Sequence, residues 1–103
     1  MLDYTKRTHY CNEINAKHVD QEILVCGWVH RRRDHGGVIF CDVRDRTGLV
    51  QLVFRPELES FKQAEGIRGE FVICAKGLVS KRPDGQENSN LATGEIEVMV
   101  SEF

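Results

Sequence analysis

The chain has 103 residues, of which 41% are hydrophobic and 29% charged, and its formal net charge is −2. This length suits one domain with one modest core, and the composition excludes a disordered, collagen-like or membrane-spanning chain. The longest apolar run, residues 71–75, is far too short to cross a bilayer, and the N-terminus lacks the pattern of a secretory signal, so we expect a cytoplasmic protein.

Residues 1–20 mix charged, amide and apolar side chains with weak periodicity. We expect a lead-in that packs on the domain formed by residues 21–103 and contains one short helical turn around residues 12–18. After this lead-in the chain becomes rich in β-forming side chains, which predicts a long first strand that continues through Arg31 to Arg33. Gly27 within this strand indicates a bulge or a sharp bend.

The rest of the chain alternates β-rich runs with turn-forming segments. Asp34 to Gly37 supply a turn, Pro56 suits the first turn of a helix, and residues 80–94 carry the side chains of a long exposed loop. In chain order, the other predicted elements are strands over 38–45 and 49–54, a helix over 57–65, and strands over 70–79 and 96–100.

This order is typical of the five-stranded Greek-key OB-fold barrel, an all-β fold with one short helix between its third and fourth strands. In such barrels the second and third strands form the usual oligonucleotide-binding face, and the loops after strands one and four frame it. An SH3-like barrel and an open α+β sheet remain alternatives on the pattern alone.

Four cysteines are spread along the chain without a C-x-x-C pair or a closely spaced His/Cys set, so no zinc or other metal site is predicted. Three of them lie inside apolar runs, where free cysteine acts as a small buried hydrophobe. We expect all four to be reduced thiols and these three to lie in the core. The four are Cys11, Cys26, Cys41 and Cys74.

Alternation along the predicted strands places three chemically distinct side chains on the outer face of the barrel. Phe40 falls on the polar side of the second strand, Gln51 opposes the apolar side of the third, and Glu97 points away from the apolar side of the fifth. An aromatic ring stacks on any base, whereas an amide or a carboxylate must match one base's edge. Alternatively, Phe40 closes one end of the barrel and the two polar residues are ordinary solvated positions.

The arginine run Arg31 to Arg33 ends the first strand beside this face and favours a site for a few phosphates, although such a run is also typical of a solvated strand end. We expect Arg44, Arg46 and Arg82 to lie nearby. Because the chain as a whole is slightly acidic, local patches must supply any attraction for nucleic acid.

No catalytic constellation is present in the sequence. The four histidines lack the spacing of a zinc site, and neither a G-x-S-x-G turn nor a glycine-rich phosphate loop occurs. Asp42 and Asp45 suit turn and salt-bridge partners better than an acid/base pair.

Five stretches together carry a resemblance to one family. They cover residues 27–34, 37–40, 43–46, 48–51 and 92–98. The combination resembles the N-terminal domain of bacterial aspartyl-tRNA synthetases, over about residues 7–103. Lysyl- and asparaginyl-tRNA synthetases share the barrel and parts of the first stretch, and the equivalent domain of either is an alternative.

The resemblance implies an OB-fold that grips the anticodon loop of aspartate tRNA and splays out its G-U-C bases. It implies that Phe40 stacks on a base, Gln51 reads the middle uracil and Glu97 helps to select the anticodon. Arg33 matches a family arginine at the anticodon, and Arg82 matches one in the following loop less closely. Ser80 departs from the family, in which some members carry another arginine.

The resemblance also implies a parent enzyme, a class II aspartate–tRNA ligase that uses ATP and Mg²⁺ and is usually a homodimer. Its catalytic domain would follow residue 103, so we expect this chain to bind tRNA without a cofactor, as a monomer, and to catalyse nothing by itself. At His35, histidine in place of leucine is associated with family members that also charge asparagine tRNA; an exposed turn histidine without any contact is the alternative.

Two other functions remain open. A sequence-tolerant single-strand binder would carry several aromatic residues on its groove and a positive charge balance, whereas here only Phe40 and Trp28 qualify. A protein-interaction barrel would present a contiguous apolar outer face in place of arginine, glutamine and glutamate.

Overall fold

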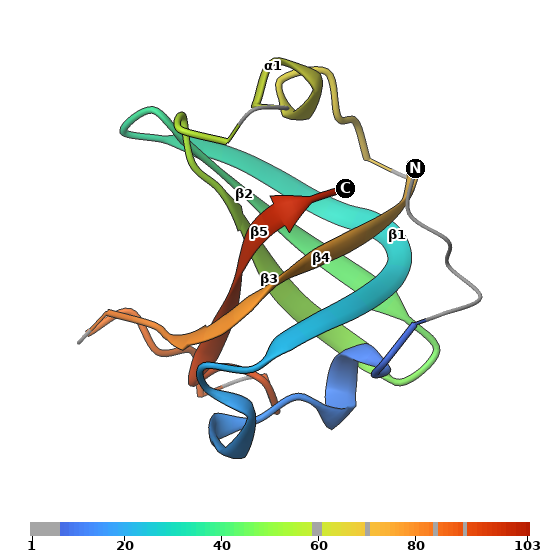
Figure 1. The fold of residues 1–103 in the computed structure, drawn as a ribbon, viewed down its shortest axis with the longest axis vertical. Helices are drawn as coiled ribbons and strands as arrows, with labels where there is room; N and C mark the ends of the chain where they lie inside the picture. The colour runs from blue at the N-terminus through green and yellow to red at the C-terminus, as the bar shows by residue number, and fades with distance from the viewer. Residues whose placement is uncertain (1–6, 59–60, 70, 84, 90) are drawn as a thin grey trace.

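The computed structural model describes the whole chain except residues 1–6, 59–60, 70, 84 and 90. Within these residues, five strands close into a barrel in the order β1-β2-β3-β5-β4 (Figure 1). Strands β3 and β5 run parallel, and the other described pairs are antiparallel. The strands are β1 (Glu22–His35), β2 (Val38–Asp45), β3 (Gly48–Phe54), β4 (Val72–Lys81) and β5 (Ile96–Glu102).

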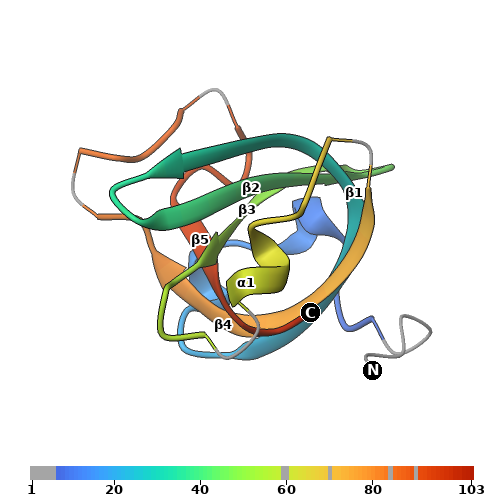
Figure 2. The ribbon, with the colours of Figure 1, turned by 90° about the horizontal axis from the view of Figure 1, so that it is seen from above.

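The prediction of an all-β OB-fold barrel with one helix between the third and fourth strands is confirmed, but the helix differs from its predicted extent. The short helix α1 covers Phe61–Ala64, and Pro56 lies in a turn rather than in a first helical turn. Residues 59–60 of the predicted helix lie outside the described residues. Seen from above, α1 sits over one mouth of the barrel (Figure 2), where its buried Ala64 joins the core. Packing against this mouth requires only one apolar turn.

Alternation along each strand builds the core. The inward side chains of β3 are Val50, Leu52 and Phe54, and all three are fully buried. Those of β2 and β5 follow the same rule, as the sequence predicts. Because the barrel is closed, every other residue of each strand is left on the outside.

The described residues before β1, 7–21, lie against the barrel through two 3₁₀ turns, η2 (Cys11–Glu13) and η3 (Ala16–His18), whereas residues 1–6 of the predicted lead-in lie outside the described part of the chain. The backbone N–H of Cys11 donates to the Asp45 carboxylate (2.7 Å), which also accepts from Thr47. Asp45 therefore serves as a turn partner, as expected.

Gly27 plays a role other than the predicted bulge. The register between β1 and β2 shifts between Val29 and Arg31, so the extra residue is His30. A Cβ atom at Gly27 would instead run into the backbone carbonyl of Arg44 and the side chain of Val43. Glycine is therefore required here by the close approach of β2.

The prediction that all four cysteines are reduced thiols is wrong for two of them. Cys11 and Cys41 are free and buried, and burial raises their pKa values to about 12 and about 11. Cys26 and Cys74 are directly opposite in the β1–β4 register and form a disulfide. An apolar run alone does not reveal which cysteine faces a partner on the neighbouring strand.

No helix in the described residues is long and apolar enough to cross a membrane.

Gly27→Ala should lower the free energy of unfolding by about 1–3 kcal/mol, because the added methyl group overpacks the β1–β2 contact. Urea denaturation followed by circular dichroism measures this. Gly69→Ala is the matched control, since a Cβ there meets nothing within 4 Å, and should change stability by less than about 0.5 kcal/mol. Equal stabilities of the two variants would contradict the assigned role of Gly27.

Candidate nucleic-acid interface

A cavity of about 700 Å³ lies on the outer face of β2 and β3 and reaches β5 and the loop after β4. Six of the seven predicted site residues line it: Arg33, His35, Phe40, Gln51, Arg82 and Glu97. We call this cavity the groove. It coincides with the surface on which OB-folds hold unpaired bases.

A chain of hydrogen bonds crosses the floor of the groove. Arg33 Nη2 donates to Gln51 Oε1 (2.9 Å), and Gln51 Nε2 donates to Glu97 Oε1 (3.2 Å). Arg33 also pairs with Asp42 at 3.5 Å. Gln51 and Glu97 point outward as predicted, yet each is only 6–7% exposed. They are therefore buried, and are not the solvated strand residues of the alternative interpretation.

Phe40 lies directly across from Arg33 in the β1–β2 register. The Arg33 guanidinium carbon is 5.8 Å from the centre of the Phe40 ring, within the range of a cation–π contact. The ring is partly exposed and lines the groove, so it does not belong to the interior core. It offers a flat apolar surface beside the polar floor.

Arg82 is a second arginine that lines the groove, in addition to Arg33. It is 92% buried, that is, 8% exposed, and its Nε donates to the carbonyl of Ile96 (2.9 Å). Its Nη2 is buried without a hydrogen-bond partner among the described residues. Burial lowers the pKa of Arg82, an effect that nearby Glu97 and Asp42 oppose. A buried donor without a partner favours an incoming acceptor.

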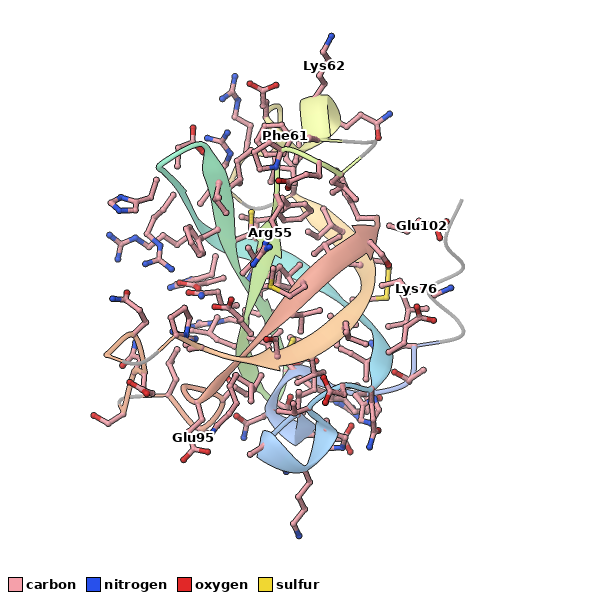
Figure 3. The ribbon with its side chains drawn as sticks, turned by 60° about the vertical axis from the view of Figure 1, so that its left-hand side comes forward. Arg55, Phe61, Lys62, Lys76, Glu95 and Glu102 are labelled. Carbon is pink, nitrogen blue, oxygen red and sulfur yellow. A yellow bond between two sulfur atoms is a disulfide. The ribbon has the colours of Figure 1, made fainter. Side chains whose placement is uncertain are left out.

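Burial also raises the pKa of Glu97 above its ordinary value. The hydrogen bond from Gln51 and the charges of Arg82 and Arg55 act in the opposite direction. Arg55, which is not among the predicted site residues, directly follows β3 (Figure 3) and lines the groove. Its position at the end of a strand of the binding face was the signal that could have identified it.

The remaining predicted cations divide between the groove and other surfaces. His35 is exposed, ends β1 opposite Val38 and lines the groove. Arg31 is exposed opposite Asp42, outside the residues that line the groove. Arg46 donates to the hydroxyl of Tyr10 (3.0 Å) at the other end of the barrel, so the expectation that it lies beside the groove is wrong.

Arg32 and Arg44 also lie away from the groove. Arg32 turns toward α1, donates to the carbonyl of Glu65 (3.2 Å) and pairs with Asp34 (3.1 Å). Arg44 is exposed on β2 opposite Trp28.

Within the described part of the chain, no three His, Cys, Asp or Glu side chains are grouped to hold a metal ion. The groove thus offers a stacking surface, edge-reading groups and cations, which suits binding of unpaired bases.

Comparison with known proteins agrees with this geometry. Residues 23–103 match the model of the tRNA anticodon family, described as an OB-fold nucleic acid binding domain. The chain is 52% identical over 107 aligned residues to an aspartate–tRNA(Asp/Asn) ligase of Geotalea uraniireducens, covering 99% of this chain and 18% of the ligase. The chain therefore spans about a fifth of the length of that curated relative.

Solved structures give the same picture. An OBody bound to hen egg-white lysozyme superposes with a TM-score of 0.80 at 27% identity, covering 98% of this chain and 94% of the OBody. Asparaginyl-tRNA synthetase of Pyrococcus horikoshii superposes with a TM-score of 0.78 at 26% identity, covering 94% of this chain and 22% of the synthetase. The family model covers residues 23–103, which is most of the sequence, and the barrel has a groove on the outer face of β2 and β3. The chain therefore belongs to the tRNA anticodon family of OB-fold nucleic acid binding domains.

Proposed function

We propose that this domain binds the anticodon loop of aspartate tRNA and is the recognition part of an aspartate–tRNA ligase. The observation that carries the proposal is the joining of Phe40, Gln51 and Glu97 in one groove, with Gln51 donating to Glu97. The family match and the relative named as an aspartate–tRNA(Asp/Asn) ligase support it.

Under this proposal, different groups in the groove supply the affinity for RNA and the selection of the base. Phe40 stacks on a base whatever its identity, while the buried Gln51 amide and Glu97 carboxylate accept only a base edge that restores their hydrogen bonds. Under this assignment Gln51 reads the middle uracil and Glu97 helps to select the anticodon. A wrong base leaves these buried groups unpaired, which costs more than a lost surface contact.

Arg33, Arg31 and Arg82 supply positive charge along the RNA. Arg33 lies over the groove, Arg31 is exposed beside it, and the Nη2 of Arg82 lacks a partner among the described residues. Phosphate contacts position the loop without reading its sequence. Arg33 and Arg82 also border Gln51 and Glu97, so they contribute both to affinity and to the choice of base.

The rest of the activity belongs to the parent protein. There, a class II catalytic domain would activate aspartate with ATP and Mg²⁺ in the cytoplasm, in a homodimer. The present domain, a monomer by itself, would contribute tRNA selection and no bond-making step. A sequence-tolerant binder is less consistent with the groove, since Phe40 is the one Phe, Tyr or Trp among the described residues that line it.

Phe40→Ala should weaken binding of the aspartate anticodon stem-loop by about 1–3 kcal/mol and leave the fold intact, because the ring lies outside the core. Titration with labelled stem-loop and circular dichroism measure the two effects. Phe40→Tyr keeps the stacking surface and should bind nearly as the unmodified domain does. Loss of folding with unchanged binding per folded molecule would contradict this role and would show that Phe40 belongs to the core.

Gln51→Ala and Glu97→Ala should each cost about 1–3 kcal/mol of discrimination between cognate and altered anticodon loops, and less of general affinity. The reason is that both groups read base edges. Arg33→Ala, by contrast, should weaken binding to every loop and flatten its salt dependence. Titrations with matched loops at several salt concentrations separate these effects.

The pH dependence provides a control for Glu97. Because burial raises its pKa, the carboxylate becomes a protonated acid while the pH is still above the ordinary pKa of glutamate, and discrimination should fall as the pH is lowered from neutrality toward that ordinary pKa. Glu97→Gln, which cannot titrate, should show no such fall. Equal losses on all loop sequences for Gln51→Ala would contradict its reading role.

His35→Leu in the full-length parent should sharpen the preference for aspartate tRNA over asparagine tRNA, whose anticodon differs at its last base. His35 lines the groove, and an imidazole both donates and accepts hydrogen bonds, whereas leucine offers shape alone. The relative's name, with both tRNAs, supports relaxed selection. Aminoacylation of both tRNAs with each enzyme decides this: strong preference in the unmodified enzyme would contradict it.

A further inference from the structure

A second surface with an exposed aromatic ring lies on β1, away from the groove. Trp28 is 38% exposed, and the Val72 side chain opposite it on β4 is 77% exposed. On its other side Trp28 faces the exposed Arg44 of β2. We call Trp28, Arg44, Arg46 and Arg7 the Trp28 surface.

This surface borders a hollow of about 460 Å³ between the N-terminal segment and the barrel, lined by Arg7, Arg46 and Trp28 among others. The guanidinium carbons of Arg7 and Arg46 lie 4.1 and 4.7 Å from the centre of the Tyr10 ring. Stacking on tyrosine holds both cations in place while leaving their charge available to an anion.

The nearby Asp45 carboxylate forms no ion pair with these cations among the described residues. Asp45 accepts hydrogen bonds from the backbone of Cys11 and from the backbone and hydroxyl of Thr47. Burial acts to raise the pKa of Asp45, but these hydrogen bonds outweigh it and lower the pKa, so the carboxylate is committed to the turn. Three arginines, Arg7, Arg44 and Arg46, outnumber this one carboxylate, so the rim of the Trp28 surface carries a net positive charge.

Strand register connects the Trp28 surface to the groove. The outward pairs between β1 and β2 are Arg33 with Phe40, Arg31 with Asp42, and Trp28 with Arg44. These pairs form one row along two strands that run side by side (Figures 1 and 2). The two ends of this row on β2, Phe40 and Arg44, are four residue positions apart, a distance of about 13 Å.

We propose that the Trp28 surface is a second RNA subsite, which takes a nucleotide flanking the anticodon bases held in the groove. Trp28 stacks on the flanking base, and Arg44 and Arg46 contact the adjoining phosphates. This assignment rests on the proposed function of the groove. An RNA strand fits better than an apolar protein partner because the exposed ring is bordered by guanidinium groups and continues the arginine row.

The chain contains a single tryptophan, so its fluorescence reports on this subsite alone. Titration with an anticodon stem-loop should change the emission of Trp28 and reduce its quenching by acrylamide. Trp28→Ala should weaken stem-loop binding roughly 5- to 150-fold, the equivalent of one stacked base. It should leave binding of the bare trinucleotide G-U-C unchanged, since that ligand fills only the groove.

Two matched variants serve as controls. Leu78→Ala removes another exposed apolar side chain from the outer side of β4 and should not change binding. Arg44→Gln should weaken stem-loop binding and reduce its salt dependence, whereas Lys62→Gln, on α1 and pointing away from the barrel (Figure 3), should do neither.

The outcomes separate this inference from the function on which it rests. Unchanged Trp28 emission at saturating stem-loop, with binding still dependent on Phe40, would overturn the second subsite and leave the groove intact. Insensitivity of stem-loop binding to Phe40→Ala would overturn the function of the groove. Protection of Trp28 that grows with protein concentration in the absence of RNA would also overturn the subsite, in favour of contact with a second copy.

Discussion

Closure of the barrel is the constraint on which the other features depend. Because β4 pairs with both β1 and β5, each of the described strands has neighbours on two sides, and its side chains have only the interior or the outer surface available. The interior takes the aliphatic residues. Polar side chains on β2, β3 and β5 are consequently gathered on one outer face, where a loop and an arginine cover them.

This same constraint explains how far the sequence predicts the structure. Alternation is a local property, so the inward residues of β2, β3 and β5 and the outward positions of Phe40, Gln51 and Glu97 follow from parity alone. Partners across strands depend on register, which parity does not give. The pairing of Cys26 with Cys74 and the extra residue at His30 were therefore missed.

The burial of Gln51 and Glu97 likewise could not be predicted from the sequence. Gln51 and Glu97 are covered because Arg33 folds over one side and Arg82 fills the other, and both contacts join residues far apart in the chain. The helix was overestimated for a related reason: helix-forming composition over 57–65 says nothing of how much apolar surface the barrel mouth needs to cover. The roles of these residues in binding RNA remain predictions.

The two hydrogen bonds of Gln51 fix the orientation of its amide, because the carbonyl oxygen accepts from Arg33 and the amino group donates to Glu97. Turning the amide over would break both bonds and would place donor against donor and acceptor against acceptor. Under the proposed function, the groove therefore presents one fixed pattern of donors and acceptors to a base. A base edge that needs the opposite pattern would have to break these bonds, so the arginine that adds affinity also holds the amide in its selective orientation.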